Sequence, residues 1–511
     1  MSVINTSGTF VLFFANLISK LFGAFYRLPL SNLLGAEGMG LYQMAFPIYS
    51  FLLTLITGGI SITLTRKIAT LRAKQNEVEI YKQYVLGKRT SMFFGIMFFI
   101  ALLIFAYPIA LLQGNLKAFY GYLAIAIGFV FACMLGAYRG YYQGYGNMIP
   151  TAISQVLEQS SKLVFGLVFA FLFLKQDAIL GVFGALLGIS VSEIISFIFF
   201  IFLNKKKVKK QQVALNKVDY INFIKQVFPV SITYVLLPLS SLIDSFLIVN
   251  LLSLSGFVTS FATSLYGIET GMILPLINMP NVLVSALALA SLPEISYRLS
   301  KNEDVTKQIS LMFKIVLMFI VPCGIGMFIL ARPILNVIFP TLNENMLQIA
   351  VNLLKFSVFE MFFLSFVTIT NALMQALNKT KKSATSLLIG IVLKVIFTII
   401  FVFNKSINIY GLVFASILCY FVVSIINIQQ IKKQINFRLN FAEITSPLIS
   451  GIIMAFVVLV FDYYFNLSKN ILGLSILVML AIITYFGLLI SLRQIRFKDI
   501  KEMLSKNKQQ N

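Results

Sequence analysis

The sequence predicts an all-α integral membrane protein with fourteen transmembrane helices, arranged as two pseudo-symmetric six-helix lobes plus two extra C-terminal helices. Three observations favour this fold class. The 511 residues are 59% hydrophobic and only 12% charged, whereas soluble domains carry about 25% charged residues. Fourteen apolar runs are long enough, at about 20 residues each, to cross a bilayer. A set of polar positions also recurs at a fixed offset, which indicates an internal duplication.

The apolar runs define the expected spans in chain order. They cover residues 6–30, 41–65, 90–112, 118–138, 151–174, 178–203, 226–250, 264–292, 310–334, 347–373, 383–404, 407–430, 446–466 and 470–491. The first run keeps polar Asn16, Lys20 and Arg27 and has no small-residue cleavage site, so we expect a retained span rather than a signal peptide. The basic stretch 492–511, with its spaced apolar residues, predicts an interfacial helix on the inner leaflet.

Two lysines inside apolar runs carry the evidence for duplication. Lys162 and Lys394 each follow a glutamine, Gln143 or Gln375, by nineteen residues, and the two copies are 232 residues apart. Six spans separate the copies, so they share one orientation and form a parallel repeat. The expected organisation is an N-lobe, a basic cytoplasmic linker, a C-lobe, two further spans and a basic cytoplasmic tail, at residues 1–203, 204–225, 226–432, 433–491 and 492–511.

The placement of basic residues predicts the orientation. If residue 1 is cytoplasmic, thirty of the 41 Lys and Arg lie in inside connections and five in outside connections. Cytoplasmic loops of membrane proteins carry such an excess, so we expect a multi-pass cell-membrane protein with both termini in the cytoplasm. The net charge of +23 then reflects orientation and attraction to anionic membrane lipids rather than nucleic-acid binding.

The residue inventory excludes or disfavours several chemistries. Histidine is absent, which excludes histidine proton relays and histidine metal sites. The three cysteines have no metal-site spacing. The eighteen Asp and Glu are scattered, and no nucleophile or phosphate-loop motif occurs. We therefore expect a protein that is not an enzyme and that has no catalytic residue, cofactor or metal site.

The first span carries a candidate anion site. Lys20 and Arg27 are seven residues apart, so they share one helix face about 10 Å apart along the axis. Asn16 extends the same face by one turn, and the span contains no carboxylate. Arginine holds phosphate through a bidentate fork and lysine acts as a point charge. The pattern therefore favours binding of a phosphate-like group, with insertion of Arg27 into the outer interface as the alternative.

Six other charged residues inside predicted spans are candidates either for balancing charge in the protein interior or for coupling transport to a cation or proton. They are Glu158, Lys162, Glu193, Asp244, Glu360 and Lys394. Glu158 precedes Lys162 by four residues, so the two can pair along one helix, and pairing and substrate binding remain alternatives for Lys162. Lys394 has no acid on its own helix, and its candidate partners are Asp244 and Glu360.

One stretch is specific enough to indicate a family. Residues 139–155 have the sequence RGYYQGYGNMIPTAISQ. This resembles the signature of SpoVB-like proteins, in the polysaccharide-transporter branch of the MOP exporter superfamily. The positions that carry the resemblance are Arg139, Gly140, Gln143, Gly144, Pro150, Ser154 and Gln155. Further matches are KLFGAFYRLPLSNLLGAEGMGLYQMAFPIY from residue 20 and LPEIS at 292–296.

The resemblance implies fourteen helices in two lobes around a central cavity, working by alternating access. Related MurJ-type lipid II flippases move an undecaprenyl-pyrophosphate-linked precursor from the inner to the outer leaflet. In that group, basic residues of the first helix face the cavity, which here implies Lys20 and Arg27, with Arg66 as a further candidate. Lys20 departs from the arginine that relatives more often have. A polyprenyl-pyrophosphate-linked glycan is the implied substrate, and cell-wall synthesis proteins are implied partners.

Two other functions remain as alternatives. A cation-coupled multidrug exporter of the same superfamily is expected to have a carboxylate in its first helix, and the first span here has none. A membrane-embedded glycan enzyme is expected to have an acidic residue on a substantial outer loop, and the outer connections carry few acids. The exact glycan and any coupling ion stay open at the level of sequence.

Overall fold

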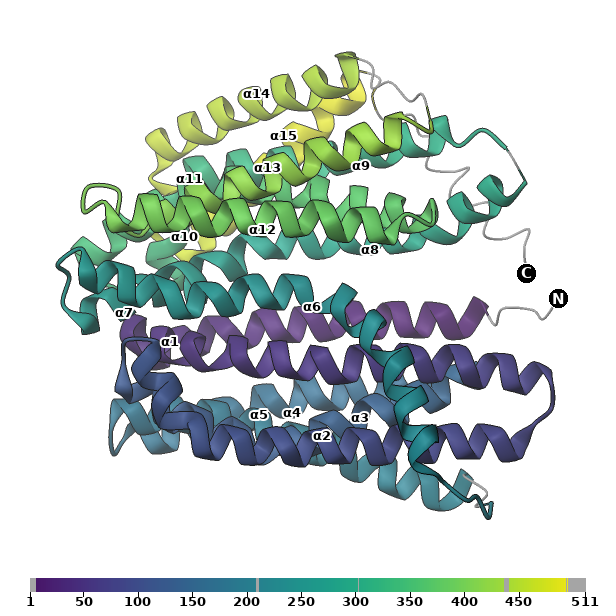
Figure 1. Cartoon of the computed structure of the whole chain (residues 1–511). Helices are drawn as coiled ribbons and strands as arrows, with labels where there is room; N and C mark the ends of the chain where they lie inside the picture. Colours follow the sequence, from purple (N-terminus) through teal and green to yellow (C-terminus); the bar gives the residue numbers. More distant parts are fainter. Residues whose placement is uncertain (1–5, 208–210, 302, 436–440, 493, 495–511) are drawn as a thin grey trace. The chain divides into compact units, whose positions relative to one another are not determined.

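The computed structural model describes residues 6–207, 211–301, 303–435, 441–492 and 494. Every regular element in these ranges is helical, which confirms the all-α prediction. The predicted tail helix lies almost wholly outside the described residues. Figure 1 labels the α-helices. The elements in chain order are α1 (Thr6–Ala73), α2 (Glu77–Leu112), η1 (Leu116–Ala118), α3 (Phe119–Gly144), α4 (Ile149–Leu174), α5 (Ala178–Lys207), α6 (Lys217–Leu254), α7 (Thr259–Gly267), η2 (Ile268–Ile273), α8 (Leu274–Ser300), α9 (Thr306–Ile329), α10 (Ala331–Ile338), α11 (Glu344–Ala376), α12 (Thr380–Phe403), α13 (Tyr410–Lys432), α14 (Phe441–Phe465), η3 (Leu467–Lys469) and α15 (Ile471–Ser491).

The chain folds into two compact units. Among the described residues, the first contains those from 6 to 276 and from 391 to 412, and the second contains those from 277 to 390 and from 413 to 494. The predicted lobes, separated by the linker at 204–225, follow a different division. Lobes of a transporter are defined by the parts that move together, so the lobe boundaries stay a prediction.

The first helix contains two of the predicted spans. α1 has 68 residues, which at 1.5 Å per residue is about 100 Å, far longer than the roughly 30 Å of a hydrocarbon core. Gly35 interrupts it with φ 67° and ψ −175°, a conformation that glycine adopts without a Cβ penalty. Figure 1 shows α1 turning back on itself. The predicted connection between residues 30 and 41 is therefore a bend within helix rather than a loop.

The described residues include thirteen helical segments that are long and apolar enough to cross a membrane. One of them is the 60-residue segment Phe14–Ala73, which has room for two crossings. The lengths and hydropathy of these segments support the prediction of a multi-pass membrane protein.

The internal duplication is visible in the helix bounds. α3 ends at Gly144 and α11 at Ala376, and α5 begins at Ala178 and α13 at Tyr410. Both pairs reproduce the 232-residue offset of the matched lysines. The turn after each first helix also contains a residue with positive φ at that offset, Gly146 at 76° and Asn378 at 56°. Helices α3–α5 and α11–α13 are therefore equivalent segments.

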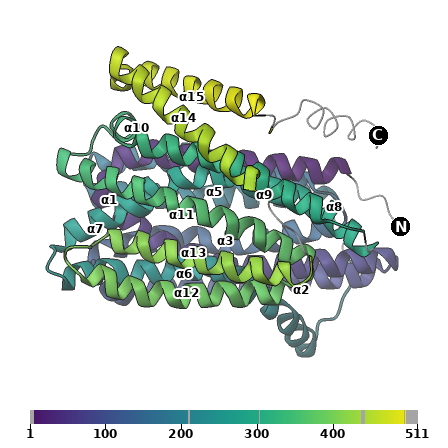
Figure 2. The same cartoon turned by 90° about the horizontal axis from the view of Figure 1, so that it is seen from above.

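The last two helices belong to the second unit. α14 and α15 lie side by side in Figures 1 and 2. Their buried side chains form one apolar cluster with Met318 of α9, and the cluster includes Val458 of α14 and Leu477 and Tyr485 of α15. This packing attaches the two helices that lie outside the duplication.

In its described residues, the basic stretch predicted as a linker is largely helical. α5 continues to Lys207, and α6 begins at Lys217. Asn216 caps α6 through a reciprocal capping box, in which its backbone N–H donates to Asp219 Oδ2 at 3.0 Å. Lys82 of α2 pairs with Asp219 at 2.9 Å. These exposed contacts hold the pKa of Asp219 below its usual range, with the Asn216 hydrogen bond as the largest cause.

Candidate functional site

Glycines bring three helices of the first unit close together. A Cβ at Gly188 of α5 would collide with Gly166 of α4, and a Cβ at Gly166 would lie 2.6 Å from Tyr26 Oη of α1. Tyr26 Oη donates to the Ala185 carbonyl of α5 at 3.2 Å. These contacts hold α1, α4 and α5 at a short spacing and direct their polar side chains around one space.

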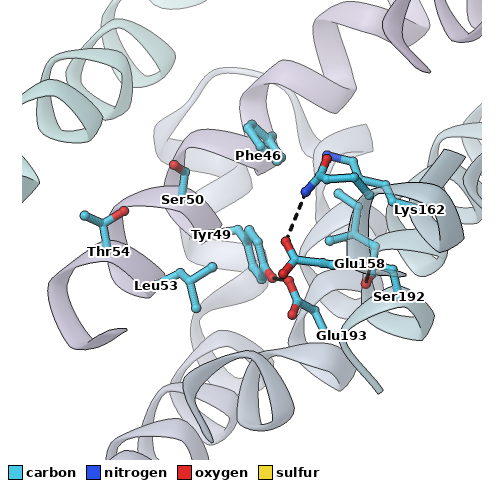
Figure 3. A pocket seen from close by; sticks show the side chains of 11 residues that line it. Phe46, Tyr49, Ser50, Leu53, Thr54, Glu158, Lys162, Ser192 and Glu193 are labelled. Carbon is cyan, nitrogen blue, oxygen red and sulfur yellow. Dashed lines mark hydrogen bonds between the residues drawn. The ribbon is translucent and has the colours of Figure 1, made fainter. Parts of the chain in front are cut away.

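That space is a cavity of about 140 Å³. Three of the predicted in-span charges line it together: Glu158 and Lys162 from α4, and Glu193 from α5 (Figure 3). Phe46 and Tyr49 of α1 form the opposite wall. Sequence spacing placed Glu158 and Lys162 on one helix, but the approach of Glu193 depends on the packing of α5.

Lys162 lies against aromatic rings. Its Nζ is 4.9 Å from the centroid of the Phe46 ring and 5.2 Å from that of Tyr26. Arg27 lies over the same Phe46 ring, with its Cζ 5.8 Å from the centroid. Within the part of the chain that the structure describes, neither Arg27 nor Lys162 forms an ion pair with a carboxylate. Two cations from α1 and α4 thus share one ring, which stabilises them through its π face.

Glu158 pairs with a different helix from the one expected. Its Oε2 lies 2.6 Å from Arg139 Nη2 of α3, and Gln159 donates to its Oε1 at 3.0 Å. An ion pair between Glu158 and Lys162, one of the two alternatives for Lys162, is not found among the described residues. Arg139 also donates from Nε to Ser154 Oγ at 3.0 Å, which fixes the guanidinium beside Glu158. Arg139 compensates the charge of Glu158, and Lys162 has no ion-pair partner among the described residues.

Glu193 is the most buried charge of the cavity, with 4% of its surface exposed. Tyr49 donates a hydrogen bond to its Oε1 at 2.7 Å. No ion pair involves Glu193 among the residues described. Its environment therefore differs from that of Glu158, although both carboxyl groups line the same cavity.

The other candidates of the predicted anion site lie apart from this cavity. Lys20 and Arg66 of α1 are exposed, and Asn16 is half-buried. None of the three lines the cavity. Of the predicted phosphate-binding residues, the structure brings only Arg27 to the ring that Lys162 contacts.

Lys394 has one of its two expected partners. Its Nζ lies 2.6 Å from Asp244 Oδ2 of α6 and donates to Ser240 Oγ at 3.3 Å. This confirms Asp244 as a partner of Lys394. Glu360, the other candidate, is buried on α11. The two matched lysines therefore differ, since Lys394 forms an ion pair with Asp244 and Lys162 forms none within the described part of the chain.

The residues of the predicted family motif hold helices together. A Cβ at Gly140 would lie 2.7 Å from the Ser61 carbonyl, and one at Gly144 would lie 2.6 Å from Ile68 Cβ, so both glycines permit close packing of α3 on α1. Gln143 Oε1 accepts from Thr65 at 3.3 Å. The other motif residues act in α4: Pro150 in its first turn, Ser154 beside Arg139, and Gln155 with a buried amide oxygen.

Sequence reasoning missed the aromatic wall. Tyr42, Phe46 and Tyr49 are spaced by four and three residues, which places them on one helix face. Phe46 stacks on Tyr42 with ring centroids 5.7 Å apart. The spacing was a usable signal for a shared face, but such a stripe is more often apolar core than a wall for cations. Among the described residues, no group of three His, Cys, Asp or Glu has the arrangement of a metal site.

Residues 6–299 match the family model of the polysaccharide biosynthesis proteins. The chain is 27% identical over 297 residues to Stage V sporulation protein B of Bacillus subtilis (strain 168), which covers 57% of this chain and 57% of that protein. It is 24% identical over 432 residues to Lipid II flippase MurJ of the same strain, which covers 77% and 76%. The first match thus spans little more than half of the relative's length.

Solved structures share the fold. Lipid II flippase MurJ in an inward closed conformation gives a TM-score of 0.75 at 16% identity, covering 95% of this chain and 99% of that one. An inward-facing MATE multidrug resistance transporter of the MOP superfamily gives 0.64 at 15% identity, covering 82% and 94%. At these identities the likeness establishes the fold alone, and it is the fold that the sequence motif implied.

Proposed function

The chain belongs to the polysaccharide biosynthesis protein family, and on that premise we propose that it is a flippase for an undecaprenyl-pyrophosphate-linked cell-wall precursor. The precursor, lipid II-like or another polysaccharide unit, moves from the inner to the outer leaflet by alternating access. One observation carries the proposal: Arg27 and Lys162 share the Phe46 ring, and neither has an ion-pair partner among the described residues. Such a pair of cations is suited to a pyrophosphate.

The physical problem of translocation explains why the cations are needed. A pyrophosphate-linked sugar cannot cross about 30 Å of hydrocarbon unaided, because the charge loses its hydration. Arg27 offers a bidentate fork and Lys162 a point charge, which together replace water around the two phosphates. The apolar polyprenyl chain stays in the lipid while the head group passes along the protein.

Further contacts along α1 are part of the same proposal. Lys20 and Asn16 precede Arg27 on this helix, and Arg66 lies near its end. Their exposure suits contact with an approaching head group rather than the bound state. We assign them a secondary role, and we place both termini in the cytoplasm because the basic connections then face inward.

The test compares three charge-removing substitutions. Arg27→Gln and Lys162→Met are expected to weaken binding of geranyl pyrophosphate by the purified protein by about tenfold or more each, because each removes a desolvated charge contact. Lys355→Met is the matched control, since the Lys355 Nζ also lies over a ring, at 5.6 Å from the Phe328 centroid in the second unit. The control is expected to bind as the wild type does.

The same variants are then expressed in cells depleted of their own lipid II flippase. Wild type and Lys355→Met are expected to restore outer-leaflet lipid II, whereas Arg27→Gln and Lys162→Met are expected to fail at normal protein levels. Full activity of both Arg27→Gln and Lys162→Met would overturn the proposed site. Absence of lipid II transfer by the wild type, with efflux of a cationic dye in its place, would favour the multidrug exporter.

A further inference from the structure

Glu193 carries a charge that the proposed anion site does not use. It lies in a membrane-spanning helix, is 4% exposed, and lines the same cavity as Lys162. A carboxylate in such surroundings is costly unless it is paired or protonated. Its hydrogen bond from Tyr49 at 2.7 Å stabilises the ionised form only in part.

The neighbouring carboxylate shows the contrast. Glu158 lies 2.6 Å from the Arg139 guanidinium, which neutralises it permanently because arginine does not release its proton in proteins. Glu193 has no comparable partner among the described residues, and Lys162 is the cationic side chain among the residues that line its cavity. The charge of Glu193 therefore depends on whether Lys162 remains available to it.

Groups on three helices act on the Glu193 carboxyl. They are Tyr49 from α1, Cys133 and Arg139 from α3, and Glu158 and Lys162 from α4. The hydrogen bond from Tyr49 and the positive charges of Arg139 and Lys162 stabilise a carboxylate here, whereas burial and the negative charge of Glu158 disfavour it. These opposing influences leave the protonation state sensitive to one added charge.

We propose that Glu193 is a proton-binding site whose occupancy is linked to the binding of an anionic head group at Arg27 and Lys162. An anion that contacts Lys162 removes the compensation that this lysine gives to Glu193 and adds repulsion of its own. Glu193 then takes up a proton from solvent, and the cavity holds the anion beside a neutral acid. The linkage is reciprocal, so protonation of Glu193 strengthens anion binding.

This inference rests on the proposed function, because it requires an anion at Lys162. The affinity of the site at Arg27 and Lys162 for its anion is then regulated by pH, and the anion binds more tightly as the pH falls. If Glu193 had only a structural role, held in place by its hydrogen bond from Tyr49, replacing it would not change the proton uptake that accompanies anion binding.

The experiment measures proton uptake on binding of geranyl pyrophosphate. The full-length protein in lipid nanodiscs is titrated by calorimetry between pH 6 and pH 9, in pairs of buffers with different ionisation enthalpies. Wild type is compared with Glu193→Gln, in which the acid is neutral at every pH. The ligand's own protonation is common to both proteins and cancels in the difference.

Wild type is expected to take up more protons than Glu193→Gln, with a difference that approaches one proton in part of the pH range. At the alkaline end, Glu193→Gln is expected to bind about tenfold more tightly than wild type, and the affinities converge at acid pH. Glu344→Gln is the control, since its carboxylate is exposed and pairs with Arg332 at 2.8 Å, and it is expected to follow wild type.

Equal proton uptake by wild type and Glu193→Gln would overturn the linkage while leaving the flippase proposal intact. Failure of the wild type to bind the ligand at all would overturn both. If Glu193→Gln does not fold, Tyr49→Phe gives a second test. It removes the hydrogen bond that favours the ionised carboxylate, so the uptake is expected to shift to higher pH, and an unchanged profile would contradict the proposal.

Discussion

At the scale of single residues, the pair between Arg139 and Glu158 decides which charges of the cavity remain open to a ligand. The two side chains are 19% and 18% exposed and 2.6 Å apart. Removing one partner of a buried pair leaves an uncompensated charge, which is more costly than removing both. In this cavity the released carboxylate would also lie close enough to attract Lys162.

A double-substitution cycle tests this role. Arg139→Met is expected to destabilise the protein by about 3 kcal/mol and to weaken geranyl pyrophosphate binding, because the freed Glu158 competes for Lys162. Adding Glu158→Gln is expected to recover part of both losses. Thermal unfolding and binding titrations in nanodiscs measure the two effects. Strictly additive losses in the double variant would show that the pair does not control Lys162.

Individual contacts were only partly predictable. The sequence identified Lys162, Glu158 and Glu193 as candidate charges, and it limited Lys394 to two partners, of which Asp244 is the one observed. Helical spacing allowed a pair of Lys162 and Glu158 as one alternative, but Arg139 reaches Glu158 from α3. Spacing within one helix does not reveal a competitor on a neighbouring helix. The sequence also does not show how α1 packs on α4. It therefore could not predict that Arg27 and Lys162 contact the same Phe46 ring.

At the scale of helices, two glycines allow a close approach of α1 and α7 in the first unit. A Cβ at Gly40 of α1 would collide with the Thr263 carbonyl of α7, and a Cβ at Gly267 of α7 would collide with the Ala36 carbonyl of α1. The two backbones are therefore in direct contact at this crossing. Close contacts between small residues are a principal source of helix association in membranes.

Substitution by alanine separates this packing effect from helix propensity. Gly40→Ala is expected to cost more than about 2 kcal/mol, because the colliding atom belongs to backbone that cannot rotate away. Gly487→Ala is the control, since a Cβ at Gly487 of α15 would meet nothing within 4 Å, and it is expected to be neutral or stabilising by up to about 1 kcal/mol. Melting temperatures of the purified variants give the comparison. Equal melting temperatures would contradict the close crossing.

The irregular backbone at η2 could be predicted only in part from the sequence. Pro275 has no N–H to donate to the Gly271 carbonyl four residues earlier, and the π-helix η2 lies at this point. Ser31 of α1 donates to that carbonyl at 3.4 Å, and Gln43 donates to the Thr270 carbonyl. The proline is visible in the sequence, but the side chains that accommodate it come from a helix more than 200 residues away.

At the scale of the whole molecule, the duplication preserves backbone more closely than charge. The 232-residue offset relates Lys162 to Lys394, but it relates Arg139 to Asn371, Glu158 to Gly390 and Glu193 to Ile425. The retained lysine is neutralised by Asp244 in one copy and faces the cavity in the other. Composition and periodicity predicted the class of fold, and the repeat predicted the equivalence of segments. Neither indicated that the proposed anion site belongs to one copy alone.

Transport of an anion predicts a dependence on membrane potential. Each net negative charge that crosses is favoured by about 2.3 kcal/mol per 100 mV toward the positive side, which corresponds to about a fiftyfold change in distribution. Vesicles containing the protein and a fluorescent polyprenyl pyrophosphate are given a potassium diffusion potential, and leaflet distribution is read by chemical quenching. Wild type is expected to enrich the label on the positive side, and Lys162→Met to remain slow. A distribution that ignores the potential would mean that no net charge moves.

The shared ring of Phe46 also makes the protein accessible to optical measurement. The chain contains no tryptophan, so Phe46→Trp would introduce the sole indole, in contact with both cations. Indole emission responds to nearby charge, and an anion that draws Arg27 and Lys162 away from the ring would change it. The absence of background emission turns this one position into a reporter of occupancy, in real time and without a labelled substrate.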